Sequence, residues 1–577
     1  MYTLTRKSTS IYGSLLTVSL LSMVIALNVT AMPPHPSLLE ARAVAKTTGE
    51  ILPNLPSTSE LHARGIDTPE DAFGLKEKIR NRQSASQSLG PFRVLAVLVD
   101  FSDHVSQVNS RFFDTLVFGA VANTVRDYFD EISYAQIDLV TVNLPSALGW
   151  KRAPQTYAYY VNNQNGLGDY PQNSQRLVEN VVDAIDAQVN FSNYDNNGDG
   201  YVDVMLVIHA GTGAELTRNA ADMWSHKWGI TPRMTGDGVY VSSYTVQPEY
   251  WTTPGDMTIG VYAHELLHGF DLPDLYDTDY TSEGIGRWCV MAGGSWNGNL
   301  GSSPAHPCAW SRIQLGITSP VNITSNVSNQ SIPSVNGGGS IFRLWTSGGA
   351  SAQYFLVENR QKTGYDTYIP GSGLLIWHID TTKNDNQQEW YPTVAGSNHF
   401  LVALEQADGL FELEHANDQG DAADCWPGSL SRTSFNGLSS PTSDAYLTGG
   451  TFVAVTNISA SGSTMTANLA VGIAASVDED QLPVPDDFRL SQNYPNPFNP
   501  NTNIQYELRT PGQVTLEVYD LLGRHVRTLF KGQAEGGVST ITWDATSDNG
   551  QQVASGVYFY RLVTTASEQT RKMMLIK

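Results

Sequence analysis

One short stretch of the chain carries side chains that can bind a metal ion and move a proton. From residue 264 it reads HELLHGFDLPDLYD. On a helix, His264 and His268 lie one turn apart on the same face, so both imidazoles can bind one metal ion. Asp274 follows where a third ligand is expected, because the helix must end before Pro273. Three such ligands are typical of zinc that keeps a fourth position for water; incidental histidines on a core helix are the alternative.

Two further residues complete the predicted site. Glu265 lies beside the first ligand, where it can act as the general base that takes a proton from a zinc-activated water. Met291 follows in the segment WCVMAGGSW (288–296), which is similar to the methionine turn beneath the metal of metzincins. A methionine packed in a glycine-rich loop is the alternative. Together these residues predict metal-assisted hydrolysis through an activated water.

The elements upstream of the site predict an α+β catalytic-type domain over residues 91–318. Residues 93–100 (RVLAVLVD) and 202–208 are apolar, β-branched runs typical of strands buried in a central sheet. Apolar residues at near-helical spacing predict two helices between these strands, the second over residues 177–185. The order of strand, helix, helix and strand is typical of α/β or α+β domains. The apolar positions of the first predicted helix are Val121, Val125, Phe129 and Ile132.

Further along the chain, the pattern changes to short strands separated by Gly, Asn and Pro turns. This texture predicts a β-sandwich over residues 319–473. A Val-, Asp- and Pro-containing stretch at 474–486 reads as a linker, and residues 487–577 form a further strand-and-turn unit. The strands expected in the sandwich include Tyr354–Glu358, Leu374–Ile379 and Phe400–Leu404.

Residues 93–470 resemble the immune inhibitor A-type secreted zinc metallopeptidases of bacteria. This resemblance implies a metzincin-like α+β fold and an endopeptidase that hydrolyses protein substrates, with zinc on His264, His268 and Asp274 and with Glu265 as general base. The segments that carry the resemblance, besides those around the site, are VLVDFSD (97–103), TVRDYF (124–129), MWSHKW (223–228), YFLVENRQ (354–361) and GSGLLIWHID (371–380).

The sequence departs from the extended metal-binding motif of that family at one position. Residue 271 is Asp, where the motif usually has Gly. The glycine allows a positive φ, which Asp tolerates at modest cost. The local geometry of the turn therefore differs from that implied by the motif, and the Asp271 carboxylate is the alternative third ligand.

A second cluster of oxygen ligands lies before the strand at 202–208. Asp195, Asn197, Asp199 and Asp203, with the carbonyl of Tyr201, alternate along the chain as ligands do in calcium loops. Closely spaced carboxylates repel one another without a cation, which favours Ca²⁺. A turn rich in Asp and Asn is the alternative.

Both ends of the chain read as targeting segments. Residues 1–31 have a positive start, an apolar stretch and small residues before position 32, as in a cleaved signal peptide. An uncleaved membrane anchor is the alternative. Residues 32–90 read as a pro-segment, with a spacer as the alternative. We expect a mature protein without a transmembrane anchor that is secreted, or attached to the outside of the cell.

Residues 487–577 resemble the C-terminal sorting domain of type IX-secreted proteins, an immunoglobulin-like β-sandwich. The motifs NYPNPFNP, GVYFYRL and a basic final strand carry this resemblance. It implies that the outer-membrane secretion machinery is a partner. An ordinary accessory β-domain is the alternative.

Composition excludes several classes of protein. With 34 Lys and Arg against 57 Asp and Glu, the formal net charge is −23, and no basic stripe indicates a nucleic-acid partner. Three cysteines allow at most one disulfide, either Cys289–Cys308 or Cys308–Cys425.

Three functions remain open from the sequence. The leading one is the secreted zinc endopeptidase. A catalytically silent surface adhesin or binding protein on a metallopeptidase fold is the second. A calcium-stabilised structural protein, in which zinc only holds the fold, is the third.

Overall fold

The computed structural model describes residues 32–36, 91–278, 280–392, 398–446, 450–472, 488–508, 510–521, 523–564 and 568–576. The expected signal peptide, most of the expected pro-segment and the expected linker lie outside these residues. The domain boundaries derived from the sequence stay predictions.

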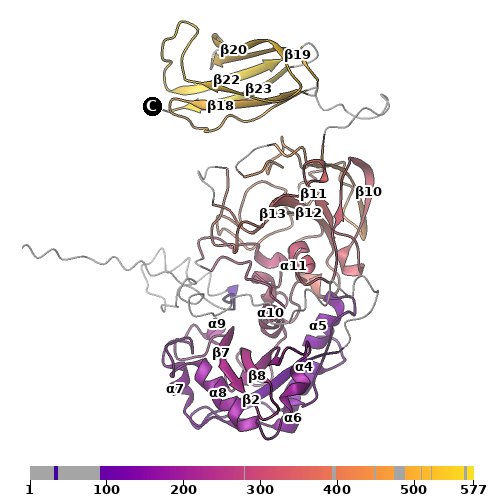
Figure 1. The fold of residues 1–577 in the computed structure, drawn as a ribbon, viewed down its shortest axis with the longest axis vertical. Helices are drawn as coiled ribbons and strands as arrows, with labels where there is room; N and C mark the ends of the chain where they lie inside the picture. Colours follow the sequence, from indigo (N-terminus) through magenta and orange to yellow (C-terminus); the bar gives the residue numbers. More distant parts are fainter. Residues whose placement is uncertain are drawn as a thin grey trace, which may run out of the picture.

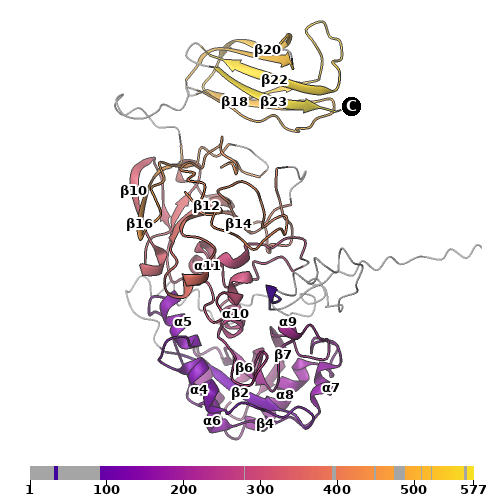
Figure 2. The ribbon, with the colours of Figure 1, turned by 180° about the vertical axis from the view of Figure 1, so that it is seen from behind.

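A six-stranded sheet forms the base of the first unit (Figures 1 and 2). Its strands β2 (Leu95–Asp100) and β6 (Met205–His209) are parallel neighbours and buried along their whole length. The two predicted strands are thus confirmed, although the second is broken at Asp203, after β5. The strand order is β4-β2-β6-β8-β5 with β7 antiparallel to β8. The other strands are β4 (Lys151–Arg152), β5 (Tyr201–Val202), β7 (His226–Met234), β8 (Tyr240–Pro248) and the separate parallel pair β1 (Pro91–Arg93) and β3 (Asp138–Val140).

Amphipathic helices cover the sheet, and one begins later than the spacing predicts. Helix α5 (Val125–Ile132) buries Val125, Phe129 and Ile132, but Val121 is 57% exposed. The reason is the cap: the Thr124 side chain accepts a hydrogen bond from the Asp127 N–H at 3.1 Å, which fixes the first turn of the helix. The other helices are α4 (Arg111–Phe118), α6 (Pro145–Leu148), α7 (Tyr157–Val161), α8 (Ser174–Ile185, which confirms the second predicted helix), α9 (Ala214–Thr217), α10 (Gly260–His268), α11 (Ala309–Gln314) and the 3₁₀ helices η1 (Phe191–Tyr194), η2 (Gly286–Trp288) and η3 (Gly293–Trp296).

Two sheets packed face to face form the second unit. The larger has the order β14-β13-β12-β11-β9 and the smaller has the order β10-β16-β15. Phe355 and Val357 pack toward the smaller sheet, whereas Leu356 and Trp377 join the core of the first unit. The larger sheet is therefore buried on both faces. The elements are β9 (Val321–Asn322), β10 (Val327–Pro333), η4 (Val335–Gly337), β11 (Phe342–Leu344), η5 (Thr346–Gly348), β12 (Gln353–Arg360), η6 (Gly364–Tyr368), β13 (Gly373–Asp380), β14 (Val402–Leu404), β15 (Ala454–Thr456) and β16 (Thr464–Ala470).

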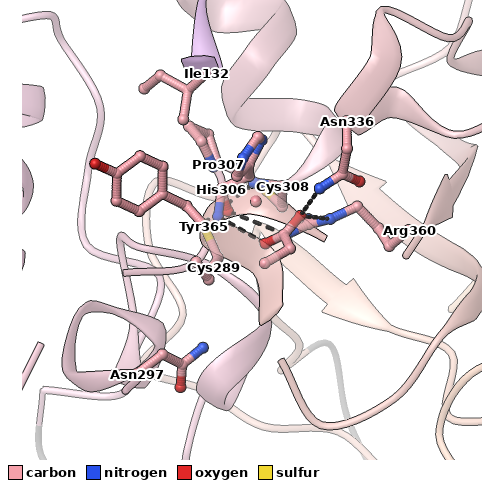
Figure 3. A network of polar contacts seen from close by, with 12 residues as sticks. Ile132, Cys289, Asn297, His306, Pro307, Cys308, Asn336, Arg360 and Tyr365 are labelled. Atoms are coloured by element: carbon pink, nitrogen blue, oxygen red, sulfur yellow. Dashed lines mark hydrogen bonds and ion pairs between the residues drawn. The ribbon is translucent and has the colours of Figure 1, made fainter. Parts of the chain in front are cut away.

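A buried ionic network joins the second unit to the first (Figure 3). Arg360 of β12 donates through Nε to Asp366 Oδ2 at 2.8 Å, and both side chains are fully buried. Asn336 Nδ2 donates to the same oxygen at 2.8 Å, and the His306 N–H donates to Asp366 Oδ1 at 2.9 Å. His306 Nε2 also lies 2.7 Å from Glu131 Oε1 on α5. The network thus holds the segment before α11 between the two units.

The C-terminal unit is a second sandwich with its own core, at one end of the molecule in Figure 1. Its sheets have the orders β17-β18-β21 and β20-β19-β22-β23. Trp543 and Tyr560 are buried between them. The strands are β17 (Phe488–Leu490), β18 (Thr502–Leu508), β19 (Gly512–Asp520), β20 (His525–Ala534), β21 (Gly537–Trp543), β22 (Gly556–Val563) and β23 (Glu568–Leu575).

Within the described residues, no helix combines the length and the apolar character that crossing a membrane requires.

Candidate metal centre

Helix α10 and the turn after it bring three ligand atoms to one point. His264 Nε2 and His268 Nε2 are 3.2 Å apart. Asp274 Oδ1 lies 3.1 Å from the first and 3.4 Å from the second. Both imidazoles are fully buried, and the Asp274 side chain is 10% exposed. The three residues that the sequence selects as ligands are therefore gathered in one group.

Backbone carbonyls fix how the two imidazoles face this point. His264 Nδ1 donates to the carbonyl of Val290 at 2.8 Å, and His268 Nδ1 donates to that of Leu272 at 2.8 Å. A carbonyl oxygen can only accept, so the proton of each neutral ring sits on Nδ1 and the Nε2 lone pairs converge. With the carboxylate, three electron-pair donors meet where a cation is required.

The spacing of these atoms fits zinc. With ligand bonds of about 2.0–2.1 Å, the ligand atoms of a tetrahedral zinc site lie about 3.3–3.4 Å apart. Burial lowers the pKa of His264, which keeps the imidazole neutral. Burial alone raises the pKa of Asp274, but the imidazoles of His268 and His264 outweigh it and lower that pKa below its ordinary value. Neutral imidazoles and an ionised carboxylate are the forms that bind a metal.

The turn after α10 delivers Asp274. The helix ends at His268, and Asp271 adopts φ +66°. Asp271 thus takes the positive φ that glycine allows at this position of the motif, and it is not part of the group of converging ligands. The Leu275 N–H then donates to the carbonyl of Met291 at 2.8 Å, which ties the third ligand to the segment below.

The segment around Met291 supports the site through its backbone. Met291 is fully buried, the carbonyl before it orients His264, and its own carbonyl holds the residue after Asp274. Its role as a methionine turn stays a prediction. Glu265 is fully buried on α10, directly after the first ligand, and its role as general base also stays a prediction.

Cysteines near the site carry free thiols. Cys289, Cys308 and Cys425 are buried, and none forms a disulfide. The Cys308 N–H donates to Cys289 Sγ at 3.3 Å.

In the predicted calcium loop, backbone N–H groups donate hydrogen bonds to most of the carboxylate oxygens. Asp195 accepts hydrogen bonds from the N–H groups of residues 198, 199 and 200, at 2.6, 3.1 and 2.9 Å. Asn197 Nδ2 donates to Asp199 Oδ2 at 2.7 Å, and the Tyr201 N–H donates to Asp199 Oδ1 at 2.9 Å. These bonds are those of a turn rich in Asp and Asn.

Asp203 differs from the rest of this loop. Its Oδ2 accepts from the N–H and from Nδ2 of Asn196 at 2.7 and 2.6 Å, but its buried Oδ1 has no hydrogen-bond partner. Burial raises the pKa of Asp203 to about 7. Among the described residues, the carboxylates of Asp195, Asp199 and Asp203 are not one of the groups of three that converge within 4.8 Å. Calcium binding at this loop stays a prediction.

Residues 32–36 pack close to the metal centre, which the sequence does not indicate. In Figures 1 and 2 this indigo segment lies beside α9. Trp224 Nε1 donates to the carbonyl of Met32 at 3.1 Å, and Trp296 Nε1 donates to that of Pro33 at 2.7 Å. Trp296 belongs to η3, which packs against α10. The start of the expected pro-segment is thus bound next to the helix that carries the histidines.

Two segments of the chain match models of known protein families. Residues 90–316 match the family model of the immune inhibitor A peptidase M6 catalytic domain, and residues 499–568 match that of the FlgD Ig-like domain. These matches support a metallopeptidase. They confirm a multidomain, β-rich chain with an Ig-like C-terminal domain. The metzincin-like detail and the sorting function stay predictions.

Individual relatives cover only parts of the chain. The pre-pro-metalloprotease PrtV of Vibrio cholerae serotype O1 is 28% identical over 277 residues, which are 38% of this chain and 29% of that protein. Immune inhibitor A of Bacillus thuringiensis subsp. alesti is 37% identical over 139 residues, 20% of this chain and 19% of that protein. The chain thus spans less than a third of the length of the curated relatives it matches. Dimeric latent PorU from Porphyromonas gingivalis, 24% identical, covers 20% of this chain and 11% of that one with a TM-score of 0.15, too low to bear on the fold.

Proposed function

We propose that the protein is a secreted zinc-dependent endopeptidase. The observation that carries this proposal is the convergence of two imidazole lone pairs and one carboxylate oxygen, 3.1–3.4 Å apart, on a buried helix. Because both Nδ1 protons are donated to backbone carbonyls and the exit turn presents Asp274, both Nε2 atoms and the carboxylate oxygen are directed at one point, as ligands of a metal ion are. The similarity of residues 90–316 to a peptidase catalytic domain supports peptide bonds as the bonds attacked.

The chain's own residues divide the work of hydrolysis. His264, His268 and Asp274 would hold zinc. When bound, zinc supplies Lewis acidity, bringing the pKa of a coordinated water to about 7. Glu265, on the same helix, takes a proton from the attacking water and returns it to the leaving amine. Val290 and Leu272 keep both imidazoles in the reactive orientation through their carbonyls.

The metal content of purified variants tests the ligand set. We expect His268→Ala and Asp274→Ala to lose stoichiometric zinc, while Asp271→Ala retains it, as measured by inductively coupled plasma mass spectrometry after dialysis. Asp271→Ala is the matched control, because this carboxylate lies three residues from the ligand and outside the group. Retention of zinc by Asp274→Ala, with loss by Asp271→Ala, would reassign the third ligand.

The silent adhesin remains the second candidate function. It shares the metal site but predicts zinc binding without hydrolysis of any protein substrate. The structural-protein hypothesis makes the same prediction and adds that Glu265 can be replaced without consequence.

Residues 32–90 act as a pro-segment in this proposal. The burial of Met32 and Pro33 between Trp224 and Trp296 supports a steric block beside the metal centre. The chain contains no cysteine before residue 289, so latency does not use a thiolate from the pro-segment.

The C-terminal unit, in the same proposal, is a type IX sorting domain that contacts the outer-membrane secretion machinery. Its Ig-like character supports this role, together with the sequence motifs that resemble such domains. Deleting residues 487–577 is expected to retain the protein inside the cell, as measured by immunoblotting of culture medium and cell fractions. If the shortened protein is exported as well as the full chain, the C-terminal unit is an ordinary accessory domain and not a sorting domain.

A further inference from the structure

A second group of converging carboxylates lies in the loop between β14 and β15. Residues 405–424 contain seven acidic residues, and no Lys or Arg occurs between Lys383 and Arg432. Carboxylate oxygens of Asp408, Glu412 and Asp424 lie within 4.8 Å of one another. A second group of three, which shares Glu412, adds Asp418 and Asp421 toward the solvent.

One carboxylate oxygen of the inner group lacks any partner. Asp424 is 1% exposed. Its Oδ2 accepts from the Asp421 N–H at 2.9 Å and from Trp288 Nε1 at 3.3 Å, whereas its buried Oδ1 has no hydrogen-bond partner. A buried oxygen of this kind costs free energy unless a ligand satisfies it. Because Oδ2 already accepts these hydrogen bonds, Oδ1 is the Asp424 oxygen that remains available to a ligand shared with Asp408 and Glu412.

The charges of this group also lack compensation from the protein. Within the described part of the chain, none of the five carboxylates forms an ion pair with Lys or Arg. Burial, together with the charges of Asp408 and Asp421, raises the pKa of Asp424 to about 8. Burial and the charges of Asp418, Asp408 and Asp421 raise the pKa of Glu412. Bringing these side chains together is unfavourable without a bound cation.

We propose that Asp408, Glu412 and Asp424 bind a Ca²⁺ ion, with Asp418 and Asp421 on its solvent side. Oxygen donors alone select a hard cation and disfavour zinc, which prefers nitrogen and sulfur. Ca²⁺–O bonds of about 2.4 Å place opposite ligands about 4.8 Å apart, and an irregular loop suits the flexible coordination of Ca²⁺ better than the strict octahedron of Mg²⁺. This site is distinct from the candidate loop at 195–203.

The proposed ion would hold the loop against the segment that supports the metal centre. Glu283 and Arg287 donate backbone hydrogen bonds to the carbonyls of Leu413 and Gln419, at 2.8 and 2.9 Å. Trp288 donates to Asp424 from the same segment, three residues before the methionine of the predicted turn. Ca²⁺ binding is therefore expected to stabilise the floor of the zinc site from the second unit.

Terbium luminescence tests the site, because Tb³⁺ replaces Ca²⁺ and is excited through a neighbouring indole. The full chain with Glu265→Ala, which removes self-digestion, is saturated with zinc and titrated with Tb³⁺ under tryptophan excitation. We expect terbium emission that is lost when excess Ca²⁺ is added and is kept when Mg²⁺ is added at the same concentration. Trp288 is the indole in contact with the site, so Trp288→Phe lowers the emission while the Ca²⁺-dependent rise in Tm remains.

Substitutions in the two loops locate the ion. Asp408→Asn and Asp424→Asn, each isosteric, should weaken Ca²⁺ binding by roughly tenfold or more, since ligand charge sets the affinity of such sites. Asp199→Asn in the other loop is the matched control and should leave the tryptophan-excited emission unchanged. If Asp424→Asn fails to fold by circular dichroism, Asp408→Asn decides alone. Wild-type emission and Tm response in Asp408→Asn, or no Ca²⁺-reversible emission in the parent, would overturn the proposal. Neither readout depends on peptidase activity.

Discussion

Asp366→Asn is the substitution whose effect the structure defines most sharply. The Asp366 carboxylate is fully buried and accepts two hydrogen bonds from Arg360, one from Asn336 and one from the backbone of His306. Asparagine keeps the shape but removes the charge, so the guanidinium of Arg360 stays buried with only Glu358, 3.4 Å away, as a counter-ion. This network joins the second unit to the first, and its loss should destabilise both.

The expected cost follows from the burial of both partners. Removing one partner of a buried ion pair typically costs about 3–5 kcal/mol, because the remaining charge loses its compensation. Glu358 retains part of that compensation, so we expect about 3 kcal/mol. An exposed pair provides the contrast: Arg126 and Asp138 are 2.7 Å apart with side chains 30% and 43% exposed. Asp138→Asn should cost at most about 1 kcal/mol.

Urea unfolding measures both variants in a Glu265→Ala background at fixed zinc and calcium. Tryptophan fluorescence reports on the network directly, since Trp377 Nε1 donates to Glu358 at 2.9 Å. Asp366→Asn should move the first transition to clearly lower urea than Asp138→Asn. Equal shifts for the two variants would refute the assignment of this pair as the joint between the units.

Three further outcomes follow from the same structure. The Arg360 guanidinium outweighs burial and holds the pKa of Asp366 well below its unfolded value of about 3.9. The stabilisation that the Asp366 carboxylate gives the folded protein is therefore complete above that pH and is lost as the pH falls. The difference in unfolding free energy between parent and Asp366→Asn should stay constant from about pH 7 to 5 and shrink below about pH 4. Burial raises the pKa of Asp203 to about 7, so we expect any Ca²⁺ binding by the loop at 195–203 to be stronger at about pH 8 than at about pH 6. The rise of Tm with Ca²⁺ should then grow over that interval, and Asp203→Asn should reduce this growth; Asp186→Asn, whose carboxylate accepts from the Gly236 N–H outside that loop, is the control. A chain that begins at residue 91 should hydrolyse an unstructured protein faster than one that begins at residue 32. The peptide MPPHP, added to the shorter chain, should slow that hydrolysis. Equal rates would show that residues 32–36 do not contribute to latency.

The sequence predicts local features of the metal centre well, because they depend on short-range geometry. Helical spacing places His264 and His268 on one face, and the helix ends before the proline at 273, as the sequence predicts. The left-handed conformation of Asp271, which replaces the glycine of the motif, is seen only in the structure. The apolar strands β2 and β6 can likewise be predicted, since burial on both faces leaves polar residues only at their C-terminal ends, Asp100 and His209.

Features of the sites that depend on contacts between distant parts of the chain cannot be predicted from the sequence in the same way. The carbonyls that orient the imidazoles belong to Val290 and Leu272, and any residue type supplies a carbonyl. The inner carboxylate group needs Asp408 beside Asp424, which the loop achieves by a backbone bond between Ala407 and Asp424 at 2.8 Å. From the sequence alone, residues 420–424 read equally well as a solvated turn.

Hydrolysis of an unstructured protein by the processed chain, beside Glu265→Ala at equal zinc occupancy, tests the central claim most directly. The account predicts turnover by the parent and a loss of roughly 10²–10⁴-fold or more in the variant, as expected when a general base is removed. Equal rates in the two proteins, or no hydrolysis by a zinc-loaded parent, would contradict it.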